Sequence, residues 1–537
     1  MKKLIAPAIF FFPWLLLAGQ APDRSRPDSI GLHKVRLDEQ EKLISWIGPP
    51  QLAYDSFLRS RWNFVKTKAP MSPPPSPRDL YPQYYFYCAF ENDMRPSTWM
   101  NDVGEKLPNW FESARLYYAY SGDRQVMDIV IKMADYYLAH GTGAADFNWP
   151  NFPYTTTNAG DTLFRGFTSG KFMEEHEIQV DHAGDMGNTW FRLYQFTGQK
   201  KFLQAAIHVA DVLADKAKEG NEKNSPWPYR VVMSTGKVTA PYGANWAGCY
   251  MLLVNLAATK TGNFNAYLQA AEKLKRFIAA FPMKTGYWTD GHTDTDVKSN
   301  TYKSNLSASN INLLLYDYPD FDSHWKQSAP ALIQWTEENF INRTAPGEPA
   351  SQWGANIVGE QDTFLFKMDY QTARYAAACA RWFAVSGDSS YREKAYRSLN
   401  WVTYCNDREG KAYESPLSKG ILSWWSDTYG EGPRMFYPVF SAIPEWAPLH
   451  QNHILYSAGI LTRISYGKNN ISYYATAGPG IEYIKTAFKP AIVRINGKRV
   501  AATNSKKATG YHLQKMDGGD YSLTIYRDLP GTVIISD

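Results

Sequence analysis

The chain has 537 residues, of which 44% are hydrophobic and 20% are charged, and its formal net charge is +5. These proportions are typical of a globular protein and exclude an intrinsically disordered chain. The charge is small for so long a chain, so we expect no nucleic-acid-binding function.

The N-terminal residues 1–21 have the pattern of a secretory signal peptide. Lys2 and Lys3 precede an apolar run over residues 4–17, and the small residues Ala18, Gly19 and Ala21 follow. This run is too short to span a membrane, and no Cys follows it that could carry a lipid anchor. We therefore expect a secreted or periplasmic protein without a membrane span.

Residues 22–75 are predicted to form an N-terminal segment outside the main domain. A helix is expected over about 38–46, and the Pro-rich stretch 69–75 has the composition of a linker.

A repeated pattern then dominates the chain. An aromatic-rich apolar helix is followed by Ser or Thr, Gly and a polar residue, and then by an amphipathic helix. The glycines of four copies are Gly122, Gly198, Gly262 and Gly387. Glycine ends a helix at the left-handed position that other residues adopt only at a cost. The gap between the last two is about twice the others, so a degenerate copy is expected near residue 320, and a sixth at 453–465.

Each unit is predicted to be a helical hairpin. The first helix is apolar on nearly all faces and should be buried, whereas the second is amphipathic and should face water on one side. Six such hairpins can close into two concentric rings, and an open superhelix is the alternative. The number of units and the long links before the first helices favour closure.

Phrases such as YAYSGDRQVMDI and FAVSGDSSYREKA, with this repeat geometry over residues 76–468, resemble the six-hairpin glycosidase-like superfamily. The resemblance implies a mainly α fold, an (α/α)6 toroid, and a carbohydrate ligand. Glycoside hydrolases, polysaccharide lyases and sugar epimerases all use this scaffold, and no motif selects one of them.

Residues 469–537 are predicted to form a small C-terminal antiparallel β module. Asn496-Gly497 suits a type I′ turn between two strands, and further strands are expected over 521–526 and 532–536.

The candidate catalytic residues lie in loops that lead into the predicted inner helices. The densest segment, 174–185, holds five carboxylates and two histidines. A carboxylate there can act as a general acid or base, with a histidine tuning its protonation. The alternatives are that Asp185 caps a helix and that residues 174–177 lie on a solvated face. The predicted catalytic set is Asp181, Asp185, Glu177, His182, Asp362 and Glu431.

The 15% aromatic content, with 18 Trp and 36 Tyr, indicates either a large core or sugar-binding platforms. The predicted substrate-binding set is Trp190, Trp246, Tyr242, Trp288, Asp290, Trp425, Trp446 and His450. Asp290, with Asp294 and Asp296, could bind calcium, but a solvated turn is favoured because the spacing is not that of an EF-hand. We expect no metal and no cofactor.

Glycoside hydrolysis requires two carboxyl groups, and pairs such as Asp181 or Asp185 with Asp362 or Glu431 could supply them. The favoured function is an exported glycoside hydrolase that acts on a poly- or oligosaccharide. A lyase or epimerase acting on uronate-containing glycans is one alternative, and a non-catalytic glycan-binding protein is another. The four cysteines form no CxxC pair and are expected to be buried thiols, although one bridge is possible.

Overall fold

The computed structural model describes residues 29–69, 103–158, 174–289, 303–416 and 428–537, apart from 363, 504, 506 and 507, and a few short strands between these ranges. The predicted signal peptide lies outside the described residues. No helix in the described ranges has the length and apolar character needed to cross a membrane.

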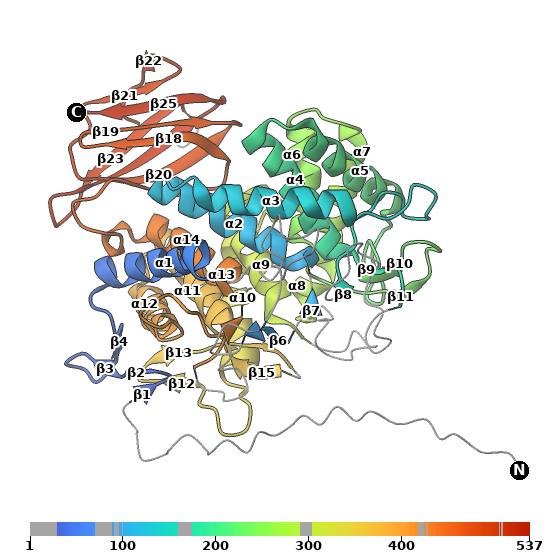
Figure 1. The fold of residues 1–537 in the computed structure, drawn as a ribbon, viewed down its shortest axis with the longest axis horizontal. Coiled ribbons are helices and arrows are strands. Elements are labelled where there is room, and N and C mark those ends of the chain that lie inside the picture. The colour runs from blue at the N-terminus through green and yellow to red at the C-terminus, as the bar shows by residue number, and fades with distance from the viewer. Residues whose placement is uncertain are drawn as a thin grey trace, which may run out of the picture.

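Five helical hairpins follow one another along the chain, in the places where the repeated pattern predicts them (Figure 1). The pairs are α2 (Val103–Ser121) with α3 (Gln125–His140), α4 (Val180–Thr197) with α5 (Lys200–Lys216), α6 (Ala247–Ala258) with α7 (Phe264–Ala280), α9 (Asn305–Asp317) with α10 (Trp325–Thr336), and α11 (Asp369–Ser386) with α12 (Ser389–Thr403). The four glycines of the repeat have φ values between 65° and 77°. Their predicted left-handed conformation is therefore confirmed.

The first helices of the hairpins contact one another in a closed order. Helix α2 packs against α4, α4 against α6, α6 against α9, and α9 against α11. Helix α11 then contacts the short helices α13 (Thr428–Glu431) and α14 (Phe436–Ala442), and α13 packs back onto α2. An open superhelix has no such return to its starting point. We refer to α2, α4, α6, α9, α11 and the α13–α14 segment as the inner helices.

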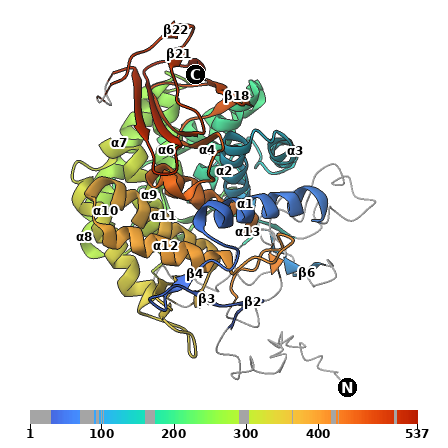
Figure 2. The ribbon, with the colours of Figure 1, turned by 90° about the vertical axis from the view of Figure 1, so that its left-hand side faces the viewer.

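The sixth unit differs from the prediction. Residues 453–465 form strands instead of a hairpin, and the outer helix of this unit comes from the N-terminus. Helix α1 (Pro50–Thr67) lies beside α12 and also contacts α3 and α13 (Figure 2). It begins at Pro50, a residue favoured in the first helical turn because it has no N–H to satisfy. The prediction of a helix at 38–46 is wrong, because the short strands β3 (Arg36–Leu37) and β4 (Leu43–Ile44) form in this region.

The C-terminal region consists of two antiparallel sheets. One has the order β17 (His453–Ser457), β20 (Gly480–Thr486), β24 (Tyr521–Arg527), β23 (Gly510–Lys515). The other has the order β18 (Leu461–Gly467), β19 (Asn470–Ala475), β25 (Gly531–Ser536), β21 (Ile492–Ile495), β22 (Lys498–Arg499). The two sheets share one apolar core. We call residues 453–537 the β module; the predicted boundary at 469 falls between β18 and β19, which pair with each other.

The β module is attached to α2. Ala119 of α2 lies in the module's apolar core. The ring of His453 stacks on Tyr120 with 4.1 Å between centroids, and His453 Nδ1 donates to the Tyr120 carbonyl oxygen over 2.8 Å. Because a carbonyl only accepts, Nδ1 carries the proton.

The remaining elements are short. They are β1 (Ser29–Ile30), β2 (His33–Lys34), β5 (Ala89–Phe90), β6 (Pro96–Thr98), β7 (Met100–Asn101), β8 (Thr157–Asn158), β9 (Glu177–Gln179), β10 (Arg230–Val232), β11 (Val238–Ala240), α8 (Pro282–Thr285), η3 (Pro319–Phe321), η4 (Glu337–Ile341), β12 (Ser351–Gln352), β13 (Ala355–Asn356), β14 (Gly359–Gln361), β15 (Phe364–Lys367), β16 (Trp424–Trp425), η6 (Pro433–Met435) and η7 (Pro444–Trp446). The sheet β11–β10–β9 leads directly into α4, and β14–β15 precedes α11.

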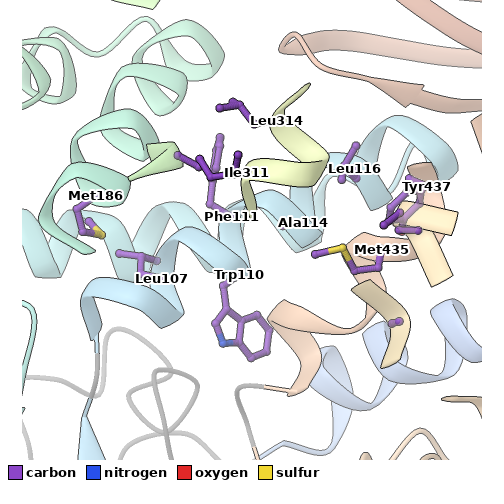
Figure 3. Close-up of a cluster of buried hydrophobic side chains, with 14 of the residues drawn as sticks. Leu107, Trp110, Phe111, Ala114, Leu116, Met186, Ile311, Leu314, Met435 and Tyr437 are labelled. Carbon is purple, nitrogen blue, oxygen red and sulfur yellow. The ribbon is translucent and has the colours of Figure 1, made fainter. Parts of the chain in front are cut away.

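The core lies between the inner helices. Figure 3 shows Leu107, Trp110 and Phe111 of α2 with side chains from α4, α9 and the α13–α14 segment. Of the cysteines, Cys249, Cys379 and Cys405 are buried free thiols, as predicted, and Cys88 lies outside the described residues.

Candidate active site

A cavity of about 170 Å³ lies among the inner helices. Its walls come from α2, α4, α6, α9, α11, η6 and α14, and from Tyr456 and Ala458 of the β module. Residues more than 300 positions apart in the chain therefore face one space.

Four inner helices carry pairs of polar residues seven positions apart. The pairs are Glu105 and Glu112 on α2, Asp185 and Arg192 on α4, Asn310 and Asp317 on α9, and Arg374 and Arg381 on α11. Seven residues make about two helical turns, a rise of about 10.5 Å, so both members of a pair lie on the same face. We call the first members the N-terminal layer and the second members the C-terminal layer. All of these residues except Arg374 line the cavity.

The charged side chains of the C-terminal layer form ion pairs and hydrogen bonds with one another and with neighbouring residues. Glu112 pairs with Arg115 and with Arg192, the latter over 2.7 Å. Burial opposes ionisation of Glu112, but Arg115 and Arg192 together outweigh it and lower its pKa to about 2. Asp317 pairs with Arg381 over 3.0 Å and accepts the Tyr456 hydroxyl.

This layer also fixes the β module. Arg115 Nη1 donates to the Ser457 carbonyl over 2.9 Å, and Arg192 Nη2 donates to the Ala458 carbonyl. Ser457 is the last residue of β17, and Ala458 begins the turn that leads to β18. Because its charged groups are paired within the protein, we infer that the C-terminal layer serves to attach the β module to the inner helices.

The N-terminal layer has a different character, which is clearest at Asp185. This side chain lines the cavity and accepts no hydrogen bond from the residues that the structure describes. Burial, reinforced by the charges of Asp181 and Glu105, raises the pKa of Asp185 to about 7, against the opposing effects of His182 and Arg434. At neutral pH a large fraction of Asp185 is therefore a neutral acid that can donate a proton.

A chain of amides borders Asp185. Asn245 Nδ2 donates to Asp181 Oδ2 over 3.0 Å, and Asn310 Nδ2 donates to Asn245 Oδ1 over 2.9 Å. Arg374 in turn donates to Asn310 Oδ1. This chain joins α11, α9, the loop before α6 and α4, and so holds the N-terminal layer in one arrangement.

Arg374 has capacity for further contacts. It is fully buried, and its Nε and Nη2 have no hydrogen-bond partner among the described residues. Burial and the neighbouring Arg434 lower the pKa of Arg374 to about 10, so it stays charged at neutral pH. Arg434 lines the cavity on η6.

A second group of acids surrounds Lys106. Its Nζ lies 2.8 Å from Glu431 Oε1 and 3.1 Å from Glu105 Oε2. Asn109 Nδ2 also donates to Glu431 Oε1 over 3.2 Å. Burial raises the pKa of Glu431, and Lys106 opposes this effect. Of the two acids, Glu105 reaches the cavity wall.

The predicted catalytic residues fall into two groups. Asp185 lines the cavity, and Asp181 and His182 are buried one turn earlier, with 3.7 Å between His182 Nε2 and Asp181 Oδ2. Glu431 belongs to the same region through Lys106 and Glu105, as described above. The structure thus brings four of the six predicted residues to one region, beside the N-terminal parts of α2 and α4.

Glu177 and Asp362 have other contacts. Glu177 accepts the Glu174 N–H over 2.6 Å and the Thr239 hydroxyl, both within the segment around β9 and β11. Asp362 accepts the Lys303 N–H over 3.1 Å and pairs with Arg343. Neither lines the cavity.

The predicted aromatic platforms pack inside the protein. Trp190, Trp246, Trp288 and Tyr242 are at most 3% exposed. Trp446 packs against Tyr54 and Tyr396 between α1 and α12. None of these rings lines the cavity, so their burial accounts for much of the aromatic surplus.

The last three predicted substrate-binding residues lie elsewhere. His450 is exposed beside Asp520, 3.2 Å away, next to the β module. Asp290 and the side chain of Trp425 lie outside the described residues. Among the described residues, no group of three or more His, Cys, Asp or Glu side chains is placed to hold a metal ion.

Other polar residues also line the cavity. Glu105, Asn245, Asn310 and Arg434 line the cavity, and none of them belongs to the predicted catalytic or substrate-binding sets. Sequence does contain a signal for two of them. Polar residues recur with a spacing of seven on helices that are otherwise apolar, and this spacing places them on one buried face.

Comparison with solved structures confirms the resemblance to the six-hairpin glycosidase-like fold. The cellobiose 2-epimerase of Spirochaeta thermophila aligns with a TM-score of 0.50 and 8% identity, covering 67% of this chain and 90% of the epimerase. The cellobiose 2-epimerase of Bacillus thermoamylovorans aligns with a TM-score of 0.50 and 11% identity, covering 71% and 99%. A family 76 glycoside hydrolase from a bovine Bacteroides thetaiotaomicron strain aligns with a TM-score of 0.46 and 12% identity, covering 73% and 78%.

At these identities the likeness concerns the fold alone. No protein-family profile matches the chain, and no curated protein sequence matches it.

Proposed function

We propose that this protein is a glycoside hydrolase, built as an (α/α)6 toroid, that cleaves a poly- or oligosaccharide by acid–base catalysis at the N-terminal layer. The closed order of inner-helix contacts supports the toroid. The observation that carries the function concerns Asp185. Its carboxyl group lies on the cavity wall, and burial raises its pKa to about 7.

Asp185 is proposed as the general acid. Protonation of the leaving-group oxygen requires a carboxyl group that is neutral at the working pH, and burial supplies this condition. The side chain has no competing acceptor role toward a described residue, so its proton is available to a ligand in the cavity.

Glu105 is proposed as the second carboxylate. It faces the same cavity from the neighbouring helix α2, and its charge acts on Asp185. Its ion pair with Lys106 suits a group that works in the charged form, as a nucleophile or as the base that activates water. The amides of Asn245 and Asn310 and the guanidinium of Arg434 are proposed to orient sugar hydroxyls.

An epimerase is the second candidate. The two structures with TM-scores of 0.50 are both cellobiose 2-epimerases, and a buried histidine, His182, lies beside Asp181. Hydrolysis is preferred because His182 does not line the cavity, whereas the carboxyl groups of Asp185 and Glu105 do.

The test is incubation of the wild type and two variants with a panel of neutral and uronate-containing glycans. A hydrolase releases reducing ends from at least one glycan, and Asp185→Asn lowers this rate by about 10²–10⁴-fold. Asp215→Asn, the same change at an exposed site on α5, should keep full activity. Isomerised sugars without new reducing ends would indicate an epimerase, and unsaturated ends would indicate a lyase. Binding without any product would favour a glycan-binding protein.

We also propose that the protein is exported, on the basis of the N-terminal pattern over residues 1–21. Fractionation of cells and determination of the mature N-terminus test this proposal.

A further inference from the structure

Positive charge is concentrated in the β module. Residues 453–537 contain 11 Lys and Arg against 5 Asp and Glu, whereas residues 22–452 contain 44 against 47. Two of the module's acids are used internally, since Glu482 pairs with Arg527 over 2.7 Å and Asp520 with Lys485 over 3.3 Å, all four buried. Among the other charged residues of the module that the structure describes, seven Lys and Arg and three Asp are exposed, so this surface charge is mostly positive.

One face of the five-stranded sheet is free of acids. Ile471, Tyr473, Val493, Ile495, Val533 and Ile535 point into the module's core. The residues that alternate with them form the opposite face. Along this face Ser472 pairs with Ile534, Ile534 with Arg494, and Arg494 with Arg499. Neighbouring positions on the same strands are Asn470, Tyr474, Thr532, Ser536 and Ile492, so no Asp or Glu lies among them. Figure 1 shows this sheet, with β21 and β22 at the end of the module away from the helices.

Two arginines lie directly opposite each other on this face. Arg494 and Arg499 are Cα partners of the antiparallel pair β21–β22, and both are exposed. Like charges at opposite positions destabilise a sheet. Each guanidinium donates one hydrogen bond to a backbone carbonyl, Arg494 to Gly497 and Arg499 to Ala491, and so has most of its five donors available. Arg463, also exposed, lies over the ring of Tyr474.

Protection of the sheet edge explains only part of this pattern. Lys and Arg on an edge strand prevent pairing with other sheets, and β22 is such a strand. Arg494, however, lies on β21, which pairs on both sides, with β25 and with β22. Its position opposite Arg499 therefore requires another reason, and an anionic ligand that bridges both groups supplies one.

We propose that this face of the β module binds an anionic polysaccharide, through carboxylate or sulfate groups held by Arg494 and Arg499. Guanidinium groups bind such planar or tetrahedral anions through paired hydrogen bonds, and the hydroxyls of Ser472, Thr532 and Ser536 suit sugar hydroxyls. The choice of a glycan over another polyanion rests on the proposed function. The face would hold an acidic polymer next to a catalytic domain that has little net charge of its own.

Affinity electrophoresis in native gels tests this proposal, with polygalacturonate, heparin or neutral dextran in the gel. The wild type should be retarded by at least one of the two polyanions and not by dextran. Arg494→Glu/Arg499→Glu should bind at least about tenfold more weakly, and salt between about 50 and 200 mM should weaken wild-type binding steeply. Lys260→Glu/Lys284→Glu, the same charge change at exposed sites of the helical part, should bind as the wild type does.

Retardation of the Arg494→Glu/Arg499→Glu variant equal to that of the wild type would overturn the proposal, as would equal or stronger retardation of the wild type by double-stranded DNA. Failure of the wild type to bind either polyanion would also overturn it. Asp185→Asn should bind normally, which separates this proposal from the catalytic one.

Discussion

Gly248 of α6 lies against the carboxyl group of Asp185 on α4, so closely that a Cβ at position 248 would lie 1.6 Å from Asp185 Oδ1. Real atoms do not approach this closely, and therefore only glycine permits the observed position of Asp185. The same helix pair is close at Gly184, where a Cβ would lie 2.2 Å from Cys249 Sγ.

Gly248→Ala should therefore displace Asp185 and reduce activity by at least about tenfold, while overpacking costs about 1–3 kcal/mol of unfolding free energy. Activity assays and chemical denaturation measure the two effects. Gly198→Ala is the control, because position 198 has a φ of 74° and no neighbour within 4 Å. It should lose about 1 kcal/mol of stability through backbone strain and keep its specific activity. Normal activity in Gly248→Ala would contradict the assigned role of Asp185.

Asp185→Asn should stabilise the protein at alkaline pH while it removes activity. The pKa of Asp185 is about 7 in the folded state and 3.8 without the fold, so its contribution to stability is complete below pH 3.8 and is lost as the pH rises through about 7. Near pH 8 the free energy of unfolding of the variant should therefore exceed that of the wild type by roughly 1–3 kcal/mol. Denaturant titration measures this difference. The gain should disappear near pH 4, and a variant less stable than the wild type at pH 8 would contradict the burial of this carboxyl.

His453 should make the joint between α2 and the β module sensitive to acid. Burial lowers the pKa of His453 to about 4, although its bond to Tyr120 opposes this shift. Since the pKa in the folded protein lies below the ordinary histidine value of 6.5, the contribution of His453 to stability is complete above pH 6.5 and falls by up to about 3 kcal/mol toward pH 4.

The comparison variant for this prediction is His453→Phe. It keeps an aromatic ring beside Tyr120 but loses a hydrogen bond worth about 1 kcal/mol. It should be less stable than the wild type at pH 7.5 and show a smaller loss on acidification, as measured by urea unfolding at several pH values. Parallel pH curves for the two proteins would show that His453 does not titrate with unfolding.

Glu112→Ala should loosen the β module. The substitution leaves Arg115 and Arg192 buried without their carboxylate, a change that typically costs about 3–5 kcal/mol. Amide hydrogen exchange should rise at the end of β17 and in the turn that leads to β18, whose carbonyls these arginines bind. Removing the exposed pair of Glu219 with Arg276 by Glu219→Ala should change stability by less than about 0.5 kcal/mol. Similar effects of both substitutions would contradict the structural role of the C-terminal layer.

The local part of the fold could be predicted from sequence because its signals are local. Each of Gly122, Gly198, Gly262 and Gly387 ends a helix by a conformation that depends on its own backbone, and the helices around them have clear apolar patterns. The return of the inner-helix contacts to α2 depends on contacts between distant segments. Nothing in residues 50–67 indicates that this helix packs between α3 and α12.

The sixth unit was misread for a related reason. Its inner part is short and interrupted by Pro433 and Pro438, so it lacks a long helical period. All five residues of β17 are buried, and its centre is the short apolar run over residues 454–456. Such a run does not distinguish a strand from a helix.

For the candidate site, too, sequence identified the residues with a local signal and missed those that only packing brings together. Asp181, His182 and Asp185 stand out because acids are dense around the start of α4. Glu105 and Asn310 join them only through the packing of α2 and α9 around the cavity. The aromatic residues mislead for the opposite reason, since Trp190 and Trp246 have the composition of a sugar platform but are completely buried.

The pH dependence of kcat/KM for glycan cleavage tests the central claim most directly. If Asp185 donates the proton, the activity of the wild type falls as the pH rises through about 7, because the acid form is lost. Asp185→Asn should then retain only a small residual activity without this alkaline limb. Full activity in the variant, or an alkaline limb at an unchanged position, would show that another group is the acid.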